Sequence, residues 1–260
     1  MSELANLNAN RDPQLYLLQS LDPEALLTRL LGLLDGFVGA ALRASDLPGW
    51  QVGHRTRTHQ HLSVRWDGED VAELILYSDR TTATPGNILP IAGMAIAHSV
   101  RLARAELAAH TDPLTGLANR RALQPLLLRC QPQAAVMLDL DHFKQVNDQF
   151  GHAAGDQLLT RITDRLQRHL RAGDQAFRLG GEEFLVILQS LEQDNLARAA
   201  ERLRQRLCGA ISLQGEWIRF SCSAGAAQGS ETVQALIQKA DQSLYRAKQA
   251  GRDRLITCDA

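Results

Sequence analysis

Two carboxylates, Asp139 and Asp141, follow an apolar run at residues 134–138 that has the pattern of a buried strand. The sequence H-F-K at residues 142–144 comes next and leads into a short predicted helix. A carboxylate held at the end of a rigid strand suits Mg²⁺, which prefers oxygen ligands. Backbone N–H groups of the following loop, together with Lys144, can meet an anion. Taken alone, the D-x-D spacing is explained about as often by structural capping of the strand end.

A second group of candidate residues begins with two consecutive glycines, Gly180 and Gly181, between strand-like segments. Paired glycines permit the positive-φ turn of a tight hairpin, and they let a flat base or a triphosphate approach the backbone. Glu182 and Glu183 follow directly and would project into the same site. For an isolated G-G-E-E sequence, a plain surface hairpin is the more common explanation.

Two further pairs of residues carry the groups needed to bind a nucleotide. Asn147 and Asp156 provide an amide and a carboxylate, which complement the acceptors and N–H donors of guanine. Lys248 and Arg252 lie four residues apart at the end of the last predicted helix, on one face, where both can hold phosphates. On its own, such a pair is more often a solvated helix end.

The elements that must position these residues alternate between helix and strand from residue 112 onward, which predicts a sheet covered by helices. We predict helices at residues 120–129, 158–170, 196–207 and 230–251, strands at 134–138 and 218–224, and a hairpin at 176–188.

The first 110 residues have a different, α+β pattern of helix, short antiparallel strands and a long exit helix. We predict helices at residues 23–43 and 89–109 and strands at 51–57, 62–66 and 71–77, the last two joined by a turn. The polar residues before the helix at 23–43 form a predicted tail, and Pro85-Gly86 lies in a predicted loop before the helix at 89–109.

The exit helix carries Ile96, Val100, Ala103 and Leu107 at spacings of four, three and four. This spacing is typical of the seam of a short coiled coil, and packing of the helix on its own domain explains it equally well.

Composition and charge exclude several classes of partner. The chain has 28 Lys and Arg against 29 Asp and Glu, so no basic excess indicates nucleic acid. No stretch reaches the roughly 20 apolar residues that span a bilayer, and we expect a cytoplasmic protein without a membrane span. The four cysteines form no C-x-x-C pair and are expected to be free thiols. His54, His59 and His61 lie in a polar, Arg-rich region, which favours solvated side chains over metal ligands.

Taken together, these sequences resemble the GGDEF domain, the diguanylate cyclase family, in its G-G-E-E-F form. The match extends from Asp112 to about Leu255, and its parts occur in the family's order and spacing. These parts are D-P-L-T-G-L-A-N-R-R at 112–121, the segments 139–156 and 248–252, and G-G-E-E-F at 180–184. The resemblance implies an α+β fold whose nucleotide-cyclase-like, ferredoxin-like central sheet is flanked by helices.

The resemblance also implies that the chain joins two GTP molecules into cyclic di-GMP and two pyrophosphates. The implied ligands of two Mg²⁺ ions, or of Mn²⁺, are Asp139, the backbone carbonyl of Leu140, Glu182 and Glu183. Asp139, Glu182 and Glu183 are the implied catalytic residues, with Glu182 as the candidate for assisting deprotonation. The implied substrate-binding residues are Phe143, Lys144, Asn147, His152, Asp156, Arg178, Gly180, Gly181, Lys248 and Arg252.

Two implications concern assembly and control. Each domain of this family binds one GTP, so two domains must meet face to face in a homodimer, which favours the coiled-coil interpretation of the exit helix. Arg171 and Asp174 match the family's inhibitory R-x-x-D motif for bound cyclic di-GMP, with Arg202 as a secondary contact. A helix-end arginine followed by a Gly-Asp turn is the alternative explanation.

We therefore predict a small GAF-like sensor and dimerisation domain at residues 1–88, extending to about 110 with its exit helix. A signalling helix at 89–111 and a GGDEF domain at 112–260 follow. The GAF likeness rests on the antiparallel hairpin and the exit helix, and no motif names the small-molecule or protein signal. The alternative to an enzyme is a catalytically silent module that binds GTP or cyclic di-GMP.

Overall fold

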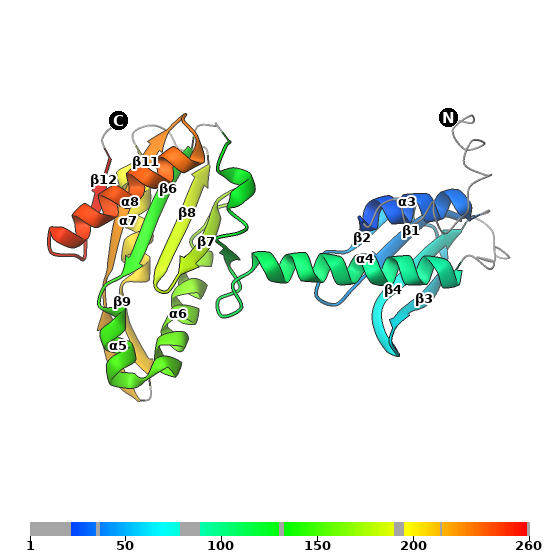
Figure 1. The fold of residues 1–260 in the computed structure, drawn as a ribbon, viewed down its shortest axis with the longest axis horizontal. Helices are drawn as coiled ribbons and strands as arrows, with labels where there is room; N and C mark the ends of the chain where they lie inside the picture. The colour runs from blue at the N-terminus through cyan, green and yellow to red at the C-terminus, as the bar shows by residue number, and fades with distance from the viewer. Residues whose placement is uncertain are drawn as a thin grey trace. The chain divides into compact units, whose positions relative to one another are not determined.

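The computed structural model describes residues 22–34, 37–78, 89–129, 133–189, 195–213 and 215–258 (Figure 1). The predicted N-terminal tail, the loop at Pro85-Gly86 and Cys130 lie outside these ranges. The chain divides into two compact units between Leu107 and Ala108. In the parts of the chain that are described, no helix is long and apolar enough to cross a membrane.

The N-terminal unit contains a four-stranded antiparallel sheet in the order β2-β1-β4-β3. Its elements are α3 (Pro23–Leu33), β1 (Phe37–Arg43), β2 (Trp50–Gly53), β3 (Thr58–Trp66), β4 (Glu69–Ser78) and α4 (Leu89–His110). Helix α3 begins where the Asp22 carboxylate accepts a hydrogen bond from the Ala25 N–H at 2.8 Å, with Pro23 in the first turn. Apolar side chains of both helices share one core with the sheet.

The predicted hairpin of this unit is confirmed, with a turn of only two residues. Trp66 pairs with Glu69, which leaves Asp67 and Gly68 in the turn, at φ values of 50° and 85°. Asp-Gly is a preferred sequence for a two-residue turn in which both residues adopt positive φ.

The predicted helix at residues 23–43 is wrong in its second half. Helix α3 ends at Leu33, and β1 runs through the sheet between β2 and β4. The strands approach so closely that a Cβ on Gly39 would lie less than 3.0 Å from the backbone of His54. Pairing with two neighbouring strands therefore overrides the local helical pattern. Strand β2 ends at Gly53, so the predicted strand at 51–57 is too long.

Helix α4 confirms the predicted exit helix, and its first half packs on its own unit. Ile96 and Val100 are 1% and 0% exposed and belong to the core of the N-terminal unit. Leu107, the last residue of the predicted seam, is 48% exposed. The coiled coil stays a prediction, and the burial of Ile96 and Val100 leaves only the C-terminal end of the helix for it.

The C-terminal unit contains a six-stranded mixed sheet in the order β12-β11-β6-β8-β7-β5, and a separate hairpin of β9 and β10. The strands are β5 (Ala118–Asn119), β6 (Gln133–Leu140), β7 (Gln175–Gly180), β8 (Glu183–Gln189), β9 (Gly209–Leu213), β10 (Glu216–Phe220), β11 (Cys222–Gly229) and β12 (Leu255–Thr257). The helices are the 3₁₀-helix η2 (Gln124–Leu126), α5 (Phe143–Phe150), α6 (His152–Gln167), α7 (Leu196–Leu207) and α8 (Val233–Gln249).

Four strands form the centre of this sheet. Numbered along the chain, β6, β7, β8 and β11 lie in the order 4-1-3-2, and all their pairings are antiparallel. With helices after the first and third strands, this is the ferredoxin-like β-α-β-β-α-β arrangement. The predicted α+β fold with a ferredoxin-like central sheet is confirmed.

Helices cover both faces of the sheet, and Figure 1 shows α8 crossing one of them. Alternate residues of β6 point to opposite faces. Val136 and Leu138 pack in a core with α6 and α7, and Ala135 and Met137 pack in a second core with α8. Because β6 is buried on both faces, its sequence is continuously apolar from Ala134 to Leu138.

Helix α8 packs so closely on β11 that one position of the strand accepts only glycine. A Cβ on Gly225 would lie less than 3.0 Å from the Ala240 carbonyl oxygen and the Leu244 nitrogen. We therefore expect Gly225→Ala to lower the free energy of unfolding by about 3 kcal/mol in urea titrations. Gly93→Ala in α4 is the control, because its Cβ would meet nothing within 4 Å. An unchanged midpoint for Gly225→Ala would contradict this close packing.

The predicted helix at residues 120–129 is wrong. Its hydrogen bonds span three residues, as from the Leu126 N–H to the Leu123 carbonyl at 2.9 Å, and only η2 is helical. Pro125 has no N–H to donate to the carbonyl four residues earlier, which disfavours an α-helix here.

The predicted strand at residues 218–224 is two strands. The break falls at Ser221: β10 pairs with β9, whereas β11 enters the central sheet beside β6. The predicted helix at 158–170 also ends earlier, at Gln167.

The predictions for histidine and cysteine side chains agree with the described structure. His54, His59 and His61 are all exposed. Of the described cysteines, Cys208, Cys222 and Cys258 form no disulfide.

Candidate active site

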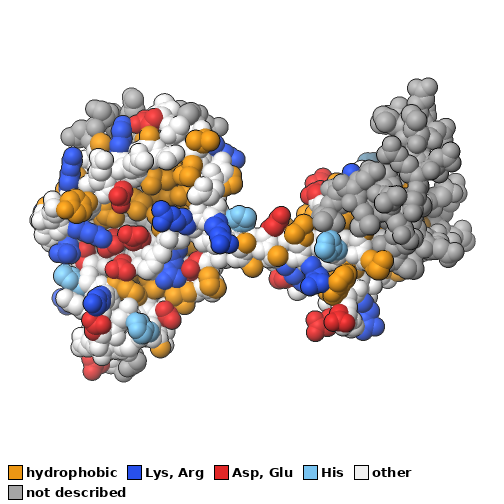
Figure 2. Space-filling model, viewed as in Figure 1, with side chains coloured by type: hydrophobic (Ala, Val, Ile, Leu, Met, Phe, Trp, Pro, Cys, Tyr) orange, Lys and Arg blue, Asp and Glu red, His pale blue; other side chains and the backbone are white. Residues whose placement is uncertain are grey.

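The three predicted catalytic carboxylates lie at the ends of adjacent strands. Asp139, near the end of β6, pairs in register with Glu183, the first residue of β8. Glu182 lies in the turn before β8, and its backbone carbonyl accepts a hydrogen bond from the Leu140 N–H at 3.4 Å. Strand pairing therefore brings Asp139, Glu182 and Glu183 to one end of the sheet. Figure 2 shows acidic side chains on this unit with Lys and Arg side chains beside them.

Negative charge exceeds positive charge around Asp139. This residue is 5% exposed, and its Oδ2 atom lies 2.7 Å from Nζ of Lys248. The pKa of Asp139 is raised to about 6, mainly because the carboxyl is buried; the charges of Glu182 and Glu183 also raise it, and Lys248 lowers it. One lysine therefore does not compensate these carboxylates, and a bound cation would.

The residues at this end of the sheet fit the predicted magnesium ions. Carboxylate and carbonyl oxygens are the ligands that Mg²⁺ prefers, and it usually binds one or two carboxylates together with substrate phosphates. Among the described residues, no three His, Cys, Asp or Glu side chains are arranged to hold a metal ion. The Leu140 carbonyl and substrate phosphates would therefore complete the ligand set.

Arg178 stabilises the turn between β7 and β8 through hydrogen bonds. Gly180 and Gly181 adopt φ values of 153° and 50°, and both are exposed. The guanidinium of Arg178 donates hydrogen bonds to the Gly181 carbonyl at 2.9 and 3.1 Å and pairs with Asp112 at 2.8 Å. The Arg178 side chain is only 12% exposed, so the contacts that the structure shows support the turn.

Helices α5 and α6 approach each other at a glycine. A Cβ on Gly155 would lie less than 3.0 Å from Oδ1 of Asn147 and 3.1 Å from Cζ of Phe143. The glycine therefore lets the Asn147 amide lie against α6, where Asp156 is the next residue. Phe143, a predicted substrate-binding residue, is 7% exposed, and its side chain packs in the core of the domain.

A family model described as "Diguanylate cyclase, GGDEF domain" matches residues 109–254, which include all of these residues. The chain belongs to the GGDEF family. The match lies within the C-terminal unit, and the features described above are those of its GGDEF domain.

Several curated and solved proteins are similar to the GGDEF domain. Diguanylate cyclase DgcP of Pseudomonas aeruginosa is 44% identical over 159 residues, which cover 56% of this chain and 23% of DgcP. Diguanylate cyclase DgcS of Shewanella oneidensis is 41% identical over 154 residues, 55% of this chain and 50% of DgcS. The chain thus matches half or less of these relatives' lengths.

A solved structure gives a similar result. The coiled coil and GGDEF domain of DgcB from Caulobacter crescentus, in complex with c-di-GMP, is 28% identical and has a TM-score of 0.57. The similarity covers 61% of this chain and 90% of that structure.

The other predicted binding residues of the GGDEF domain lie at exposed positions. Lys144 is on α5, His152 and Asp156 are on α6, and Arg252 follows α8. These four polar side chains are therefore exposed to solvent. Lys248, the remaining predicted phosphate-binding residue, contacts Asp139.

The predicted inhibitory residues lie between α6 and β7 and on α7. The Asp174 carboxylate accepts hydrogen bonds from the backbone N–H groups of Arg171 at 2.9 Å and Gln189 at 3.3 Å. The Gly-Asp turn that the sequence left as an alternative is therefore present. The side chains of Arg171 and Arg202 are exposed, and their inhibitory role stays a prediction.

Asp141 is a structural cap of the GGDEF domain. It is 5% exposed, and its carboxylate accepts hydrogen bonds from the hydroxyls of Ser221 at 2.6 Å and Ser223 at 2.7 Å. It also accepts one from the backbone N–H of Asp253 at 3.1 Å. Of the two explanations for the D-x-D spacing, capping therefore applies to Asp141.

The sequence patterns do not single out Arg204, which is 9% exposed. Hydrogen bonds to Glu201 and to Asp253 raise the pKa of its guanidinium, so it is always charged. A signal was present: Arg204 adjoins the apolar row of α7, and a charged residue on an inward face is seldom buried without partners.

Proposed function

We propose that this protein is a diguanylate cyclase, which joins two GTP molecules into cyclic di-GMP and releases two pyrophosphates. The observation that carries the proposal is the pairing of Asp139 with Glu183 and with Lys248, beside Glu182. Relatives that carry the name diguanylate cyclase, at 44% and 41% identity, support it.

In this proposal the chain binds GTP by its base and its phosphates. Asn147 and Asp156 bind the guanine edge, and Lys144, Lys248 and Arg252 hold the triphosphate. The backbone of Gly180 and Gly181 gives the nucleotide room to approach.

The reaction forms a bond between the ribose 3′-oxygen of one GTP and the α-phosphorus of the other, and pyrophosphate leaves. Mg²⁺, or Mn²⁺, held by Asp139, the Leu140 carbonyl, Glu182 and Glu183, would activate the 3′-hydroxyl and neutralise charge at the phosphates; we propose two ions per site. Glu182 lies in the exposed turn, where it assists removal of the 3′-hydroxyl proton.

Because one domain holds one GTP and the product contains two, we propose a homodimer. The N-terminal unit is proposed as a GAF-like sensor whose small-molecule or protein signal changes how the two GGDEF domains meet. We place the enzyme in the cytoplasm, where GTP is available.

Incubation of the purified protein with GTP and Mg²⁺, followed by chromatography and mass identification of nucleotides, tests the activity. We expect cyclic di-GMP and pyrophosphate, no product with EDTA, and no dinucleotide from ATP. GTP binding without product, after removal of carried-over cyclic di-GMP and confirmation of a dimer, would instead support the silent binding module.

Product inhibition through Arg171 gives a separate prediction. Loss of a charged, bidentate contact to phosphate costs about 1.5–3 kcal/mol, so Arg171→Ala should weaken inhibition by cyclic di-GMP about 10- to 100-fold. Steady-state output should rise accordingly. The measurement is the initial rate against added cyclic di-GMP, with the exposed Arg168→Ala as control. Equal inhibition of Arg171→Ala and the unchanged protein would refute the assignment.

A further inference from the structure

The loop that carries Arg252 has an unusual backbone conformation. Arg252 and Asp253 are consecutive non-glycine residues with φ values of 62° and 45°, and they follow Gly251 at 108°. For non-glycine residues this left-handed region costs on the order of 1 kcal/mol each. Such a conformation persists only where surrounding contacts hold it.

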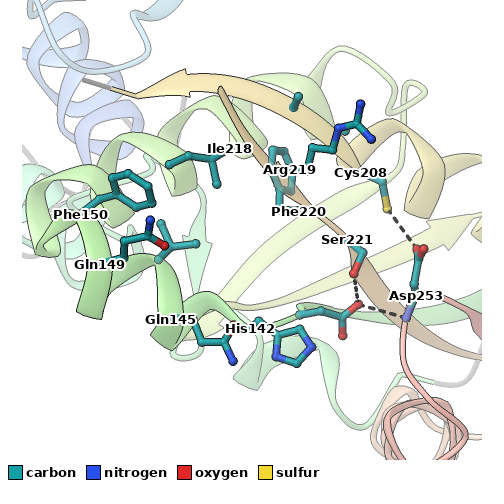
Figure 3. Close-up of a pocket in the computed structure, with 14 residues that line it drawn as sticks. His142, Gln145, Gln149, Phe150, Cys208, Ile218, Arg219, Phe220, Ser221 and Asp253 are labelled. Carbon is teal, nitrogen blue, oxygen red and sulfur yellow. Dashed lines mark hydrogen bonds between the residues drawn. The ribbon is translucent and has the colours of Figure 1, made fainter. Parts of the chain in front are cut away.

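One set of contacts comes from the end of β6. The Asp253 N–H donates a hydrogen bond to Oδ2 of Asp141, the same oxygen that accepts from the Ser221 hydroxyl. Figure 3 shows these bonds at the edge of a pocket that Ser221 and Asp253 line. The Asp141 N–H in turn donates to the Ser221 carbonyl at 3.0 Å. Asp141 thus ties the loop to the strand that bears Asp139.

A second set of contacts comes from α7 through Arg204. Its Nη1 atom donates to Oδ1 of Asp253 at 2.5 Å and to the Cys222 carbonyl at 3.1 Å. Its Nε and Nη2 atoms donate to the two carboxylate oxygens of Glu201 at 2.8 and 2.7 Å. A planar guanidinium can make these four bonds in fixed directions, whereas a lysine ammonium cannot.

We propose that Arg204 and Asp141 are positioning residues, which hold loop 251–254 so that Arg252 faces the phosphates of the substrate. The inference rests on the proposed function, from which it takes the contact between Arg252 and GTP. Arg204 bonds the Asp253 side chain and Asp141 accepts from the Asp253 backbone N–H, one residue after Arg252. In this proposal their effect on GTP passes through Arg252.

A double-mutant cycle tests this dependence. Arg204→Met keeps the aliphatic packing and removes the guanidinium's hydrogen bonds; we expect KM for GTP to rise about 10-fold, with a smaller change in kcat. In an Arg252→Ala background the same change should raise KM less than about twofold. A merely structural role would give equal factors in both backgrounds. Arg206→Met, an exposed arginine of α7, is the matched control and should leave both constants unchanged.

A second variant guards against loss of the fold. Asp253→Asn has the same shape, tolerates positive φ, and loses only the charge that Arg204 contacts. We expect a KM increase of about threefold, again absent in the Arg252→Ala background. If the KM increase caused by either variant is the same with and without Arg252→Ala, the proposal is overturned.

Binding of 3′-deoxy-GTP, measured by calorimetry with Mg²⁺, separates this inference from the proposed function, because this nucleotide lacks the attacking hydroxyl. Loss of affinity in Arg204→Met that disappears in the Arg252→Ala background supports positioning, even if GTP gives no product. If the protein forms product from GTP and Arg204→Met loses the same affinity with and without Arg252→Ala, the positioning role is overturned and the proposed function stands. An unchanged protein that binds no 3′-deoxy-GTP overturns both.

Discussion

Replacing Glu182 and Glu183 together with alanine is expected to abolish cyclic di-GMP synthesis while the GGDEF domain stays folded. Glu182 lies in the turn between β7 and β8, and Glu183 is exposed, so truncation removes little packing. Two predicted magnesium ligands are lost, and with them several kcal/mol of transition-state stabilisation. We expect the turnover rate to fall about 10³-fold or more. The measurement is the initial rate of product formation at saturating GTP and Mg²⁺.

Thermal unfolding followed by circular dichroism should show that the double variant melts within a few degrees of the unchanged protein. Surface substitutions typically change the free energy of unfolding by no more than about 0.5 kcal/mol. Glu216→Ala, which removes an exposed carboxylate from β10, is the control and should keep full activity. An unchanged turnover rate in the double variant would contradict the assignment of Glu182 and Glu183 to the active site. Glu182→Gln and Glu183→Gln, measured singly, then show which carboxylate contributes more.

Asp139→Asn is expected to abolish activity and also to stabilise the metal-free protein. Burial raises the pKa of Asp139 to about 6, against about 4 for an exposed aspartate, even though Lys248 lies beside it. The ionised carboxylate therefore destabilises the folded state, by up to about 3 kcal/mol. Asparagine has the same shape without the charge, but it leaves Lys248 without its partner. We expect the free energy of unfolding in EDTA at pH 8 to rise by about 1–2 kcal/mol.

The pH dependence of this effect has a defined sign. Because the folded-state pKa of Asp139 lies above the unfolded-state value, the folded protein binds more protons between about pH 4 and pH 6. The contribution of Asp139 to stability is therefore full below about pH 4 and is lost as the pH rises through about 6. Urea titrations of the metal-free protein and of Asp139→Asn should diverge over this interval. Parallel profiles would contradict the raised pKa.

The elements that sequence predicts well are those whose local pattern and tertiary surroundings agree. The continuous apolar run before Asp139 predicts a buried strand, and β6 is buried on both faces. Asp67-Gly68 predicts a two-residue turn because both residues accept positive φ. The error at residues 37–43 has the opposite cause, since two neighbouring strands impose extended backbone on a segment with helical periodicity.

For the candidate site, the sequence predicted which residues belong to it but not the hydrogen bonds and ion pairs that those side chains make. Asp139, Glu182 and Glu183 follow from motifs in which chemistry needs particular groups at fixed spacing. Arg204 escaped attention because its partners, Asp253 and the Cys222 carbonyl, belong to distant segments. The coiled-coil interpretation of α4 was open for the same reason: burial of Ile96 depends on the sheet beneath it.

By itself, the sequence determined which polar groups this protein has that could bind a nucleotide and a metal, and the alternation of helices and strands from residue 133 onward. Only the tertiary structure decided that Lys248 pairs with Asp139, that Asp141 is a cap, and that Arg204 contacts Asp253. These contacts depend on the order of strands in the sheet. That order is set by the burial of all the apolar faces together, a property that no local segment carries.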